Sequence, residues 1–167
     1  KNEHVLLVGG AGFIGHNLAL DLVEAGARVT IVDNLMVNSL IDNVFNENPN
    51  PIQQIAYQNF LLDRYRLLKS KSVELINTDA RMFGDLARVF GDIVPTKVVH
   101  LCAIASSVDA RKDPGLAFDL QLITLRNVLE LCRQRKTVNQ VMFLSSSTVY
   151  GDFEGASVDE SVRPRPR

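Results

Sequence analysis

The first 33 residues constrain the fold most, because they combine a short buried strand, a glycine-rich turn, a helix and a second strand. Residues 5–8 form an apolar run that ends in two glycines. Residues 14–23 carry apolar side chains at helical spacing up to Gly26, and residues 28–32 form a β-branched run that stops at Asp33. Two strands joined through a helix need a crossover connection, which makes them parallel.

The same alternation continues along the chain. After a loop over residues 35–51 with a short helical turn at most, we expect helices at 52–70, 85–93 and 115–135 and strands at 73–76, 97–101 and 140–144. The runs at 5–8, 98–101 and 141–144 are continuously apolar, which is typical of strands buried on both faces. The sequence therefore predicts an α/β fold, a doubly wound parallel sheet of the Rossmann type, in one domain over residues 1–167.

Composition and charge narrow the possible partners. The chain has 18 Lys and Arg against 19 Asp and Glu, so its net charge of -1 predicts neither a nucleic-acid nor a membrane partner. No apolar run reaches the roughly 18 residues of a membrane span, and a cytoplasmic protein is expected. Cys102 and Cys132 lack C-x-x-C spacing and are interpreted as buried free thiols, and the three scattered histidines predict no metal site.

The glycine turn has the spacing of a phosphate-binding turn. Gly9, Gly12 and Gly15 allow a sharp strand-to-helix turn, a close backbone approach and tight packing of the helix on the sheet. Backbone N–H groups and the positive helix end would then face a pyrophosphate. Asp33 follows Gly15 by 18 residues, where it can accept hydrogen bonds from adenosine ribose hydroxyls and repel a 2'-phosphate. This series predicts NAD rather than NADP; the alternative is a structural turn beside a solvated Asp33.

With these residues in place, the chain resembles the extended short-chain dehydrogenase/reductase family, especially its NAD-dependent nucleotide-sugar epimerases and dehydratases. The resemblance covers almost the whole chain and rests on short landmarks in a shared order. These are residues 9–15, 32–35, Asp79, 99–103, Asp113-Pro114, 127–130 and 145–151.

The resemblance implies a set of cofactor contacts. Phe13 and Ile14 would flank the pyrophosphate, and Asp79 would reach the adenine amino group with Ala80 alongside. An acidic residue after the third strand also lies at the sheet edge where ligands collect, although a solvated Asp79 is the alternative. The further residues that the resemblance assigns to the cofactor are Asn34, Leu35, Leu101, Cys102, Ala103 and Ser145.

Hydroxyl side chains follow the fifth strand, and the resemblance places the catalytic hydroxyl at Ser146. Hydroxyls at this edge can hydrogen-bond a sugar oxygen, although such clusters are also common turn formers. Dehydratases of the family typically have an acidic pair directly after the catalytic hydroxyl, because the elimination of water needs an additional acid and base. Ser147 and Thr148 occupy those positions here, which favours an epimerase.

The chain departs from the family pattern in three ways. Gln121 and Thr124 stand where Asn and Gly are frequent, and the segment 35–72 is longer than in many members. This insertion could shape a substrate pocket, a lid or a dimer contact, or be disordered. The Tyr-x-x-x-Lys pair that serves hydride transfer in the family occurs only at Tyr65, before the third strand, and is interpreted there as helix packing. Tyr150 has no Lys four residues on and is assigned to a turn.

The sequence is therefore interpreted as the cofactor-binding part of a longer NAD-dependent nucleotide-sugar epimerase. Its substrate would be a nucleotide sugar, and the resemblance implies a homodimer formed through the helix at 115–135. A nucleotide-sugar 4,6-dehydratase or another extended short-chain enzyme is the nearest alternative. A non-catalytic NAD-binding sensor module is the alternative from a different functional class.

Overall fold

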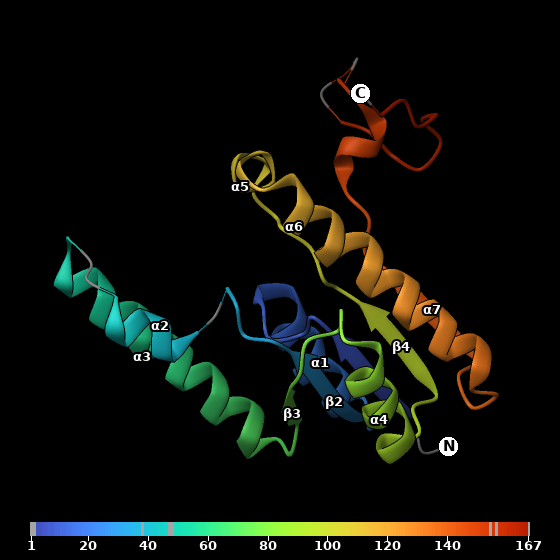
Figure 1. Cartoon of the computed structure of the whole chain (residues 1–167), viewed down its shortest axis with the longest axis horizontal. Helices are drawn as coiled ribbons and strands as arrows, with labels where there is room; N and C mark the ends of the chain where they lie inside the picture. The colour runs from blue at the N-terminus through green and yellow to red at the C-terminus, as the bar shows by residue number, and fades with distance from the viewer. Residues whose placement is uncertain (1–2, 38, 47–48, 154, 156, 167) are drawn as a thin grey trace.

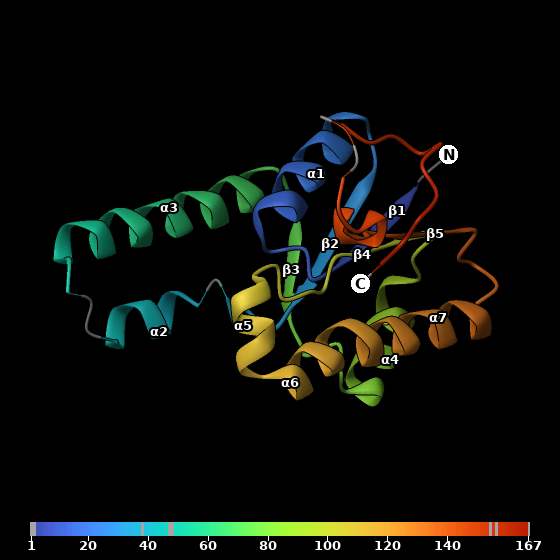
Figure 2. The same ribbon diagram turned by 90° about the horizontal axis from the view of Figure 1, so that it is seen from above.

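Five parallel strands form one sheet in the computed structural model, which describes residues 3–37, 39–46, 49–153, 155 and 157–166. The strand order is β3-β2-β1-β4-β5, so β1 is central. Figure 1 labels β2, β3 and β4 of this sheet, and Figure 2 labels β1 and β5 as well. The strands are β1 (His4–Val8), β2 (Arg28–Asp33), β3 (Glu74–Asn77), β4 (Lys97–His100) and β5 (Gln140–Phe143). In register, Val5 lies opposite Val29 of β2 and Lys97 of β4. The predicted parallel sheet is confirmed, with strand ends that differ by one residue.

Helices connect the strands and cover both faces of the sheet (Figure 2). They are α1 (Phe13–Glu24), α2 (Leu40–Phe45), α3 (Pro51–Ser70), α4 (Phe83–Ile93), α5 (Ser107–Lys112), α6 (Pro114–Phe118), a π-helix (Asp119–Ile123), α7 (Thr124–Gln134) and a 3-10 helix (Ser147–Tyr150). The predicted helix at 115–135 is therefore helical throughout most of its length but contains a π-turn. The short α5 was not predicted.

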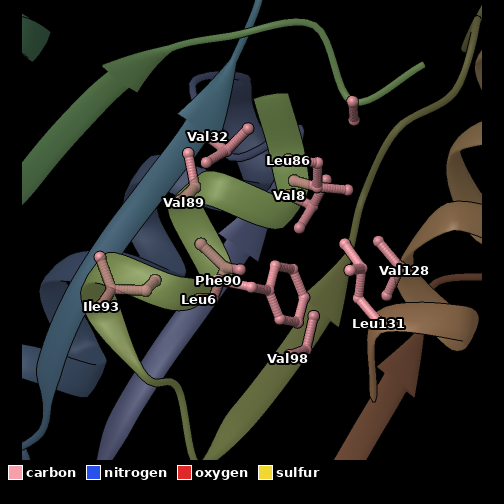
Figure 3. Packing of buried hydrophobic residues seen from close by; sticks show 11 residues of the cluster. Leu6, Val8, Val32, Leu86, Val89, Phe90, Ile93, Val98, Val128 and Leu131 are labelled. Carbon is pink, nitrogen blue, oxygen red and sulfur yellow. The ribbon is translucent and has the colours of Figure 1, made fainter. Parts of the chain in front are cut away.

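Two hydrophobic cores lie on opposite faces of the sheet, because successive strand residues point to opposite sides. Leu6 and Val8 of β1 face α4 and α7 and contact the cluster around Phe90 and Leu131 (Figure 3). Val5 and Leu7 belong to the other cluster, which includes Ala19 of α1 and Leu68 of α3. The doubly wound arrangement thus follows from continuous apolar strands that need cover on both sides.

Strand β5 corrects one expectation from the sequence. The prediction that it is buried on both faces is wrong in this structure, because Val141, Met142 and Phe143 are 37%, 53% and 49% exposed. The strand lies at the sheet edge and pairs with β4 only, with no described element on its outer side. An apolar run predicts burial, but it does not say which neighbour supplies the cover.

The inserted segment forms an arm of two helices, α2 and α3, that projects from the sheet (Figures 1 and 2). Of the apolar residues that predicted this helix, Ile52, Ile55 and Phe60 are exposed. The buried residues of α3 are Leu61, Arg64 and Leu68, all in its second half, which packs near α1. The described part of the insertion is thus mainly helical.

No helix of the described residues is long and apolar enough to cross a membrane.

Candidate cofactor-binding site

The turn after β1 needs its glycines for close packing. Gly9 has a φ of +79°, and a Cβ there would lie 2.7 Å from the backbone nitrogen of Cys102. A Cβ on Gly15 would overlap the backbone of Gly10. These two glycines therefore hold the strand, the turn and the first helix together, and Cys102 of the segment after β4 closes one side of the turn.

Gly12 differs from the other two glycines because the position that a Cβ would take there is open. It is the N-cap of α1 with a φ of -74°, and a Cβ built on it would meet no atom within 4 Å. No side chain caps the helix among the described residues, and the Phe13 and Ile14 side chains are 72% and 54% exposed. The helix therefore presents backbone N–H groups to an open surface, which suits a pyrophosphate.

Asp33 lies directly against this turn. Its Oδ2 accepts a hydrogen bond from the Ala11 N–H at 2.9 Å, and its Oδ1 accepts one from the Leu35 N–H at 2.8 Å. Both carboxylate oxygens keep lone pairs for further donors, such as ribose hydroxyls. Leu35 has a φ of +57°, an uncommon conformation for this residue type that holds the loop close to the carboxylate.

Asp79 and Asn34 meet at the neighbouring strand ends. The Asn34 Nδ2 donates to Asp79 Oδ2 at 3.3 Å, and the Asn34 Oδ1 accepts from the Met36 N–H. Arg81, which sequence reasoning missed, donates to Asp79 through Nε at 3.0 Å and Nη2 at 2.6 Å. These hydrogen bonds lower the pKa of Asp79, against the opposing effect of burial. The carboxylate is therefore held ionised at the place expected for an adenine contact.

The comparisons with known proteins bear directly on this geometry. Residues 5–167 match the model of the NAD dependent epimerase/dehydratase family. The chain belongs to this family. UDP-glucose 4-epimerase of Caenorhabditis elegans is 30% identical over 148 residues, which are 89% of this chain and 39% of that protein.

Solved structures agree with the family assignment. The UDP-glucose 4-epimerase of Thermus thermophilus, in complex with NAD, is 32% identical with a TM-score of 0.73 over 98% of this chain and 44% of that one. The enzyme of Thermotoga maritima, with UDP-glucose, is 25% identical with a TM-score of 0.72 over 98% and 45%. The chain thus spans less than half the length of these relatives. NAD is the cofactor of the family, and the open surface at Gly12 beside Asp33 fits a dinucleotide.

The segment after β4, which was predicted to line the cofactor, packs against the glycine turn. The Leu101 N–H donates to the Val8 carbonyl at 2.7 Å, which extends the β1–β4 pairing to the glycine turn. Burial raises the pKa of the Cys102 thiol to about 12, so it stays protonated, and Ala103 is exposed at the surface. Ala80 is only 6% exposed and packs in the core, so its predicted contact with adenine would use its backbone.

Ser146 is exposed at the end of β5, and Ser145 precedes it in the same exposed segment. The Oγ of Ser146 accepts hydrogen bonds from the Thr148 N–H at 3.2 Å and the Thr148 hydroxyl at 2.9 Å, and Ser146 is the N-cap of the 3-10 helix. Its own hydroxyl proton has no acceptor among the described residues. Ser146 therefore forms a turn, as hydroxyl residues often do, and still offers a donor to solvent; its catalytic role stays a prediction.

Residues of the insertion also lie at the site, which the sequence interpretation did not anticipate. Arg64 of α3 donates from Nη1 to the Ala11 carbonyl at 2.8 Å. Burial and the negative charge of Asp33 raise the pKa of the neighbouring Tyr65. The signal was present, because Leu61, Arg64 and Leu68 share one helical face and an arginine in an apolar stripe implies a specific partner. Tyr150 ends the 3-10 helix, which confirms its assignment to a turn.

A metal has no evident place in this site. Within the described ranges, no group of three or more His, Cys, Asp or Glu side chains could hold an ion.

Proposed function

We propose that this chain is the cofactor-binding part of an NAD-dependent nucleotide-sugar epimerase, whose polypeptide continues beyond residue 167. The observation that carries the proposal is the open N-terminus of α1 at Gly12 next to the Asp33 carboxylate, in a chain that matches the epimerase family over residues 5–167. When bound, NAD would take a hydride from a sugar carbon and return it to the other face of that carbon. The keto sugar would have to turn over between the two transfers, so the protein must hold the dinucleotide in place and leave the sugar room to rotate.

The residues of the chain have distinct tasks in this proposal. The N–H groups at the start of α1 bind the pyrophosphate, and the Asp33 carboxylate accepts hydrogen bonds from the ribose hydroxyls. Asp79, kept ionised by Arg81, accepts a hydrogen bond from the adenine amino group. Ser146 donates a hydrogen bond to the reacting sugar oxygen, and a Tyr-x-x-x-Lys pair beyond residue 167 supplies the base that takes the proton of the sugar hydroxyl.

Epimerisation is favoured over dehydration by the side chains around Ser146. Ser147 and Thr148 carry hydroxyls at the positions where an elimination would need a carboxylic acid and a carboxylate. The Thr148 hydroxyl is engaged with Ser146 Oγ at 2.9 Å, so it orients the serine instead of serving as a separate acid.

The test is to incubate the full-length protein with a panel of nucleotide sugars and to identify the products by NMR. We expect inversion at one sugar carbon without loss of water. Ser146→Ala should lower kcat by about 10²-fold or more with little change in NAD affinity, and Ser147→Ala is the matched control. A dehydrated product would favour the dehydratase, and NAD binding without conversion of any sugar would favour a sensor module. A reading frame without Tyr-x-x-x-Lys after residue 167 would remove the proposed base.

A homodimer through the helix of α6 and α7 is part of the same proposal. Phe118, Leu122 and Leu129 along this helix are 54%, 50% and 49% exposed, which supports an apolar contact between two copies. Leu122→Glu should convert a dimer to a monomer in sedimentation velocity. A cytoplasmic location is proposed as well, because Cys102 and Cys132 are both free thiols.

A further inference from the structure

Arg64 is a buried cation at the side of the glycine turn. Its side chain comes from α3, and the residue is 6% exposed. The guanidinium carbon lies 4.7 Å from the centre of the Phe60 ring, and Nη1 donates to the Ala11 carbonyl at 2.8 Å. A buried charge is costly unless it makes specific hydrogen bonds, so this contact fixes where the second half of α3 sits.

The Ala11 carbonyl belongs to the peptide that also carries the Gly12 N–H. This peptide is trans and planar, so its C=O and N–H point in opposite directions. An arginine that holds the carbonyl from one side therefore directs the Gly12 N–H to the other side. The hydrogen bond also polarises the peptide and makes its N–H a stronger donor.

The turn is thus held from two elements at once. The Ala11 N–H donates to Asp33 Oδ2 of β2, while the Ala11 carbonyl accepts from Arg64 of α3. Tyr65, the next residue on α3, lies within the electrostatic influence of Asp33. Figure 2 shows the second half of α3 close to α1, which agrees with their packing contact. The inserted helix therefore reaches the same corner of the fold as the carboxylate proposed for the ribose.

We propose that α3 is part of the dinucleotide site and that Arg64 is a positioning residue, which directs the Gly12 N–H at the pyrophosphate by holding the Ala11 carbonyl. The inference deepens the proposed function, since it rests on NAD binding at this turn. Arg64 does not touch the dinucleotide in this proposal. Its effect is confined to the pyrophosphate, while the adenosine contacts of Asp33 and Asp79 do not depend on it.

The experiment compares ligands with and without a pyrophosphate. Affinities of the full-length protein for NAD and ADP-ribose are measured by calorimetry, and the affinity for adenosine by NMR titration. Arg64→Met should lower the affinities for NAD and ADP-ribose about tenfold or more, and it should leave the affinity for adenosine within about twofold of the wild-type value. Arg64→Lys keeps the charge and a hydrogen-bond donor, so its affinities for NAD and ADP-ribose should fall less than those of Arg64→Met. Arg66→Met is the matched control, because Arg66 lies on the same helix, and its side chain is 73% exposed and paired with Asp63 across one turn.

The controls separate positioning from general loosening of the arm. A change that merely unpacks α3 would lower the affinity for adenosine as much as the affinity for ADP-ribose, and that result would overturn the proposal. So would an Arg64→Met protein that binds NAD as tightly as Arg66→Met. If Arg64→Met does not fold, the same comparison is made with Arg64→Lys. We then expect a loss of affinity for ADP-ribose without a loss for adenosine. Equal losses of affinity for the two ligands would contradict the positioning role. Wild-type protein that binds no NAD would overturn the proposed function together with this inference.

Discussion

Two glycines at the start of α1, its N-cap Gly12 and Gly15 in its first turn, differ in what surrounds them. Gly15 has the backbone of Gly10 where its Cβ would lie, whereas Gly12 has open space and a backbone conformation open to any L-residue. One position is therefore closed by the protein itself, and the other stays open for a ligand. Opposite consequences for stability and for NAD binding follow from this difference.

Gly15→Ala should destabilise the protein by about 3 kcal/mol, because its methyl group forces the turn and the helix apart. Gly12→Ala should lower the free energy of unfolding by about 1 kcal/mol or less. Its methyl group would occupy the space of the pyrophosphate, so the affinity for NAD should fall at least tenfold. Urea unfolding and calorimetric titration with NAD measure the two effects. If Gly12→Ala bound NAD like the wild type, the turn would not be the pyrophosphate site.

Asp33 can be tested in the same way. Asp33→Ala removes the acceptor of the Ala11 and Leu35 N–H groups and the proposed acceptor of the ribose hydroxyls. Hydrogen bonds to a charged group contribute about 1.5–3 kcal/mol, so NAD affinity should fall by about 10- to 100-fold in calorimetry. Asp85→Ala is the control, because Asp85 is an exposed carboxylate paired with Arg88 on α4. Equal affinities of the two variants would exclude Asp33 from the site.

A buried histidine connects β4 to the long helix. Thr124 donates its hydroxyl to the Leu120 carbonyl at 2.7 Å, so its oxygen accepts from Nε2 of His100 at 2.8 Å. The acceptor Leu120 lies in the π-helix, so Thr124 links this helix to His100, the last residue of β4. His100 is fully buried against Phe143 of β5, and this burial lowers its pKa to about 4.

Acid should therefore destabilise the fold through His100. Between pH 6.5 and 4 the unfolded chain binds a proton that the folded chain does not, so stability is full above pH 6.5 and falls as the pH drops towards 4. The full shift corresponds to about 3 kcal/mol. Urea unfolding between pH 7 and 4.5 should show this loss in the wild type and a shallower one in His100→Gln. The difference between the curves isolates His100 from His4, whose pKa burial also lowers; parallel curves would contradict the assignment.

Sequence patterns predicted the long elements well and the short ones poorly. Strands and helices with several buried residues can be predicted, because their apolar side chains recur with the period of the strand or the helix. The short helices α2 and α5 instead depend on their caps, where Ser39 accepts from the Asp42 N–H and Ser106 from the Asp109 N–H. The S-x-x-D spacing at both positions was an available signal of a helix start.

The candidate site was predictable where one segment contains both the turn and its contacts. The glycine turn and Asp33 lie within 25 residues of each other along the sequence, and the structure brings them together. Arg64 is 53 residues from Ala11, and its contact depends on how the insertion folds back. The exposure of β5 also could not be read from the sequence, because it depends on neighbours in space.

At the scale of the whole molecule, the two cores meet the site at the carboxyl edge of the sheet. The glycine turn, Asp79 and residues 101–103 follow strands that end there, and Asp33 is the last residue of β2, as is usual for ligand sites in doubly wound sheets. The sheet is covered at its centre but open at β5. An apolar strand edge of this kind invites pairing with further polypeptide. In the proposed longer enzyme, additional chain would cover β5 and bring the catalytic base towards Ser146.

Met142 provides a test of that cover. It is 53% exposed here, so Met142→Ser in the isolated 167-residue chain should change the free energy of unfolding by less than about 0.5 kcal/mol. In the full-length protein, where the proposed additional chain packs on β5, the same change should cost about 2 kcal/mol or more, because it removes a buried apolar side chain. Phe45→Ser on the projecting arm, at a residue 82% exposed, is the control and should cost little in both. An equally small cost of Met142→Ser in the two proteins would mean that β5 stays open to solvent, and the proposed route from the rest of the enzyme to Ser146 would have to lie elsewhere.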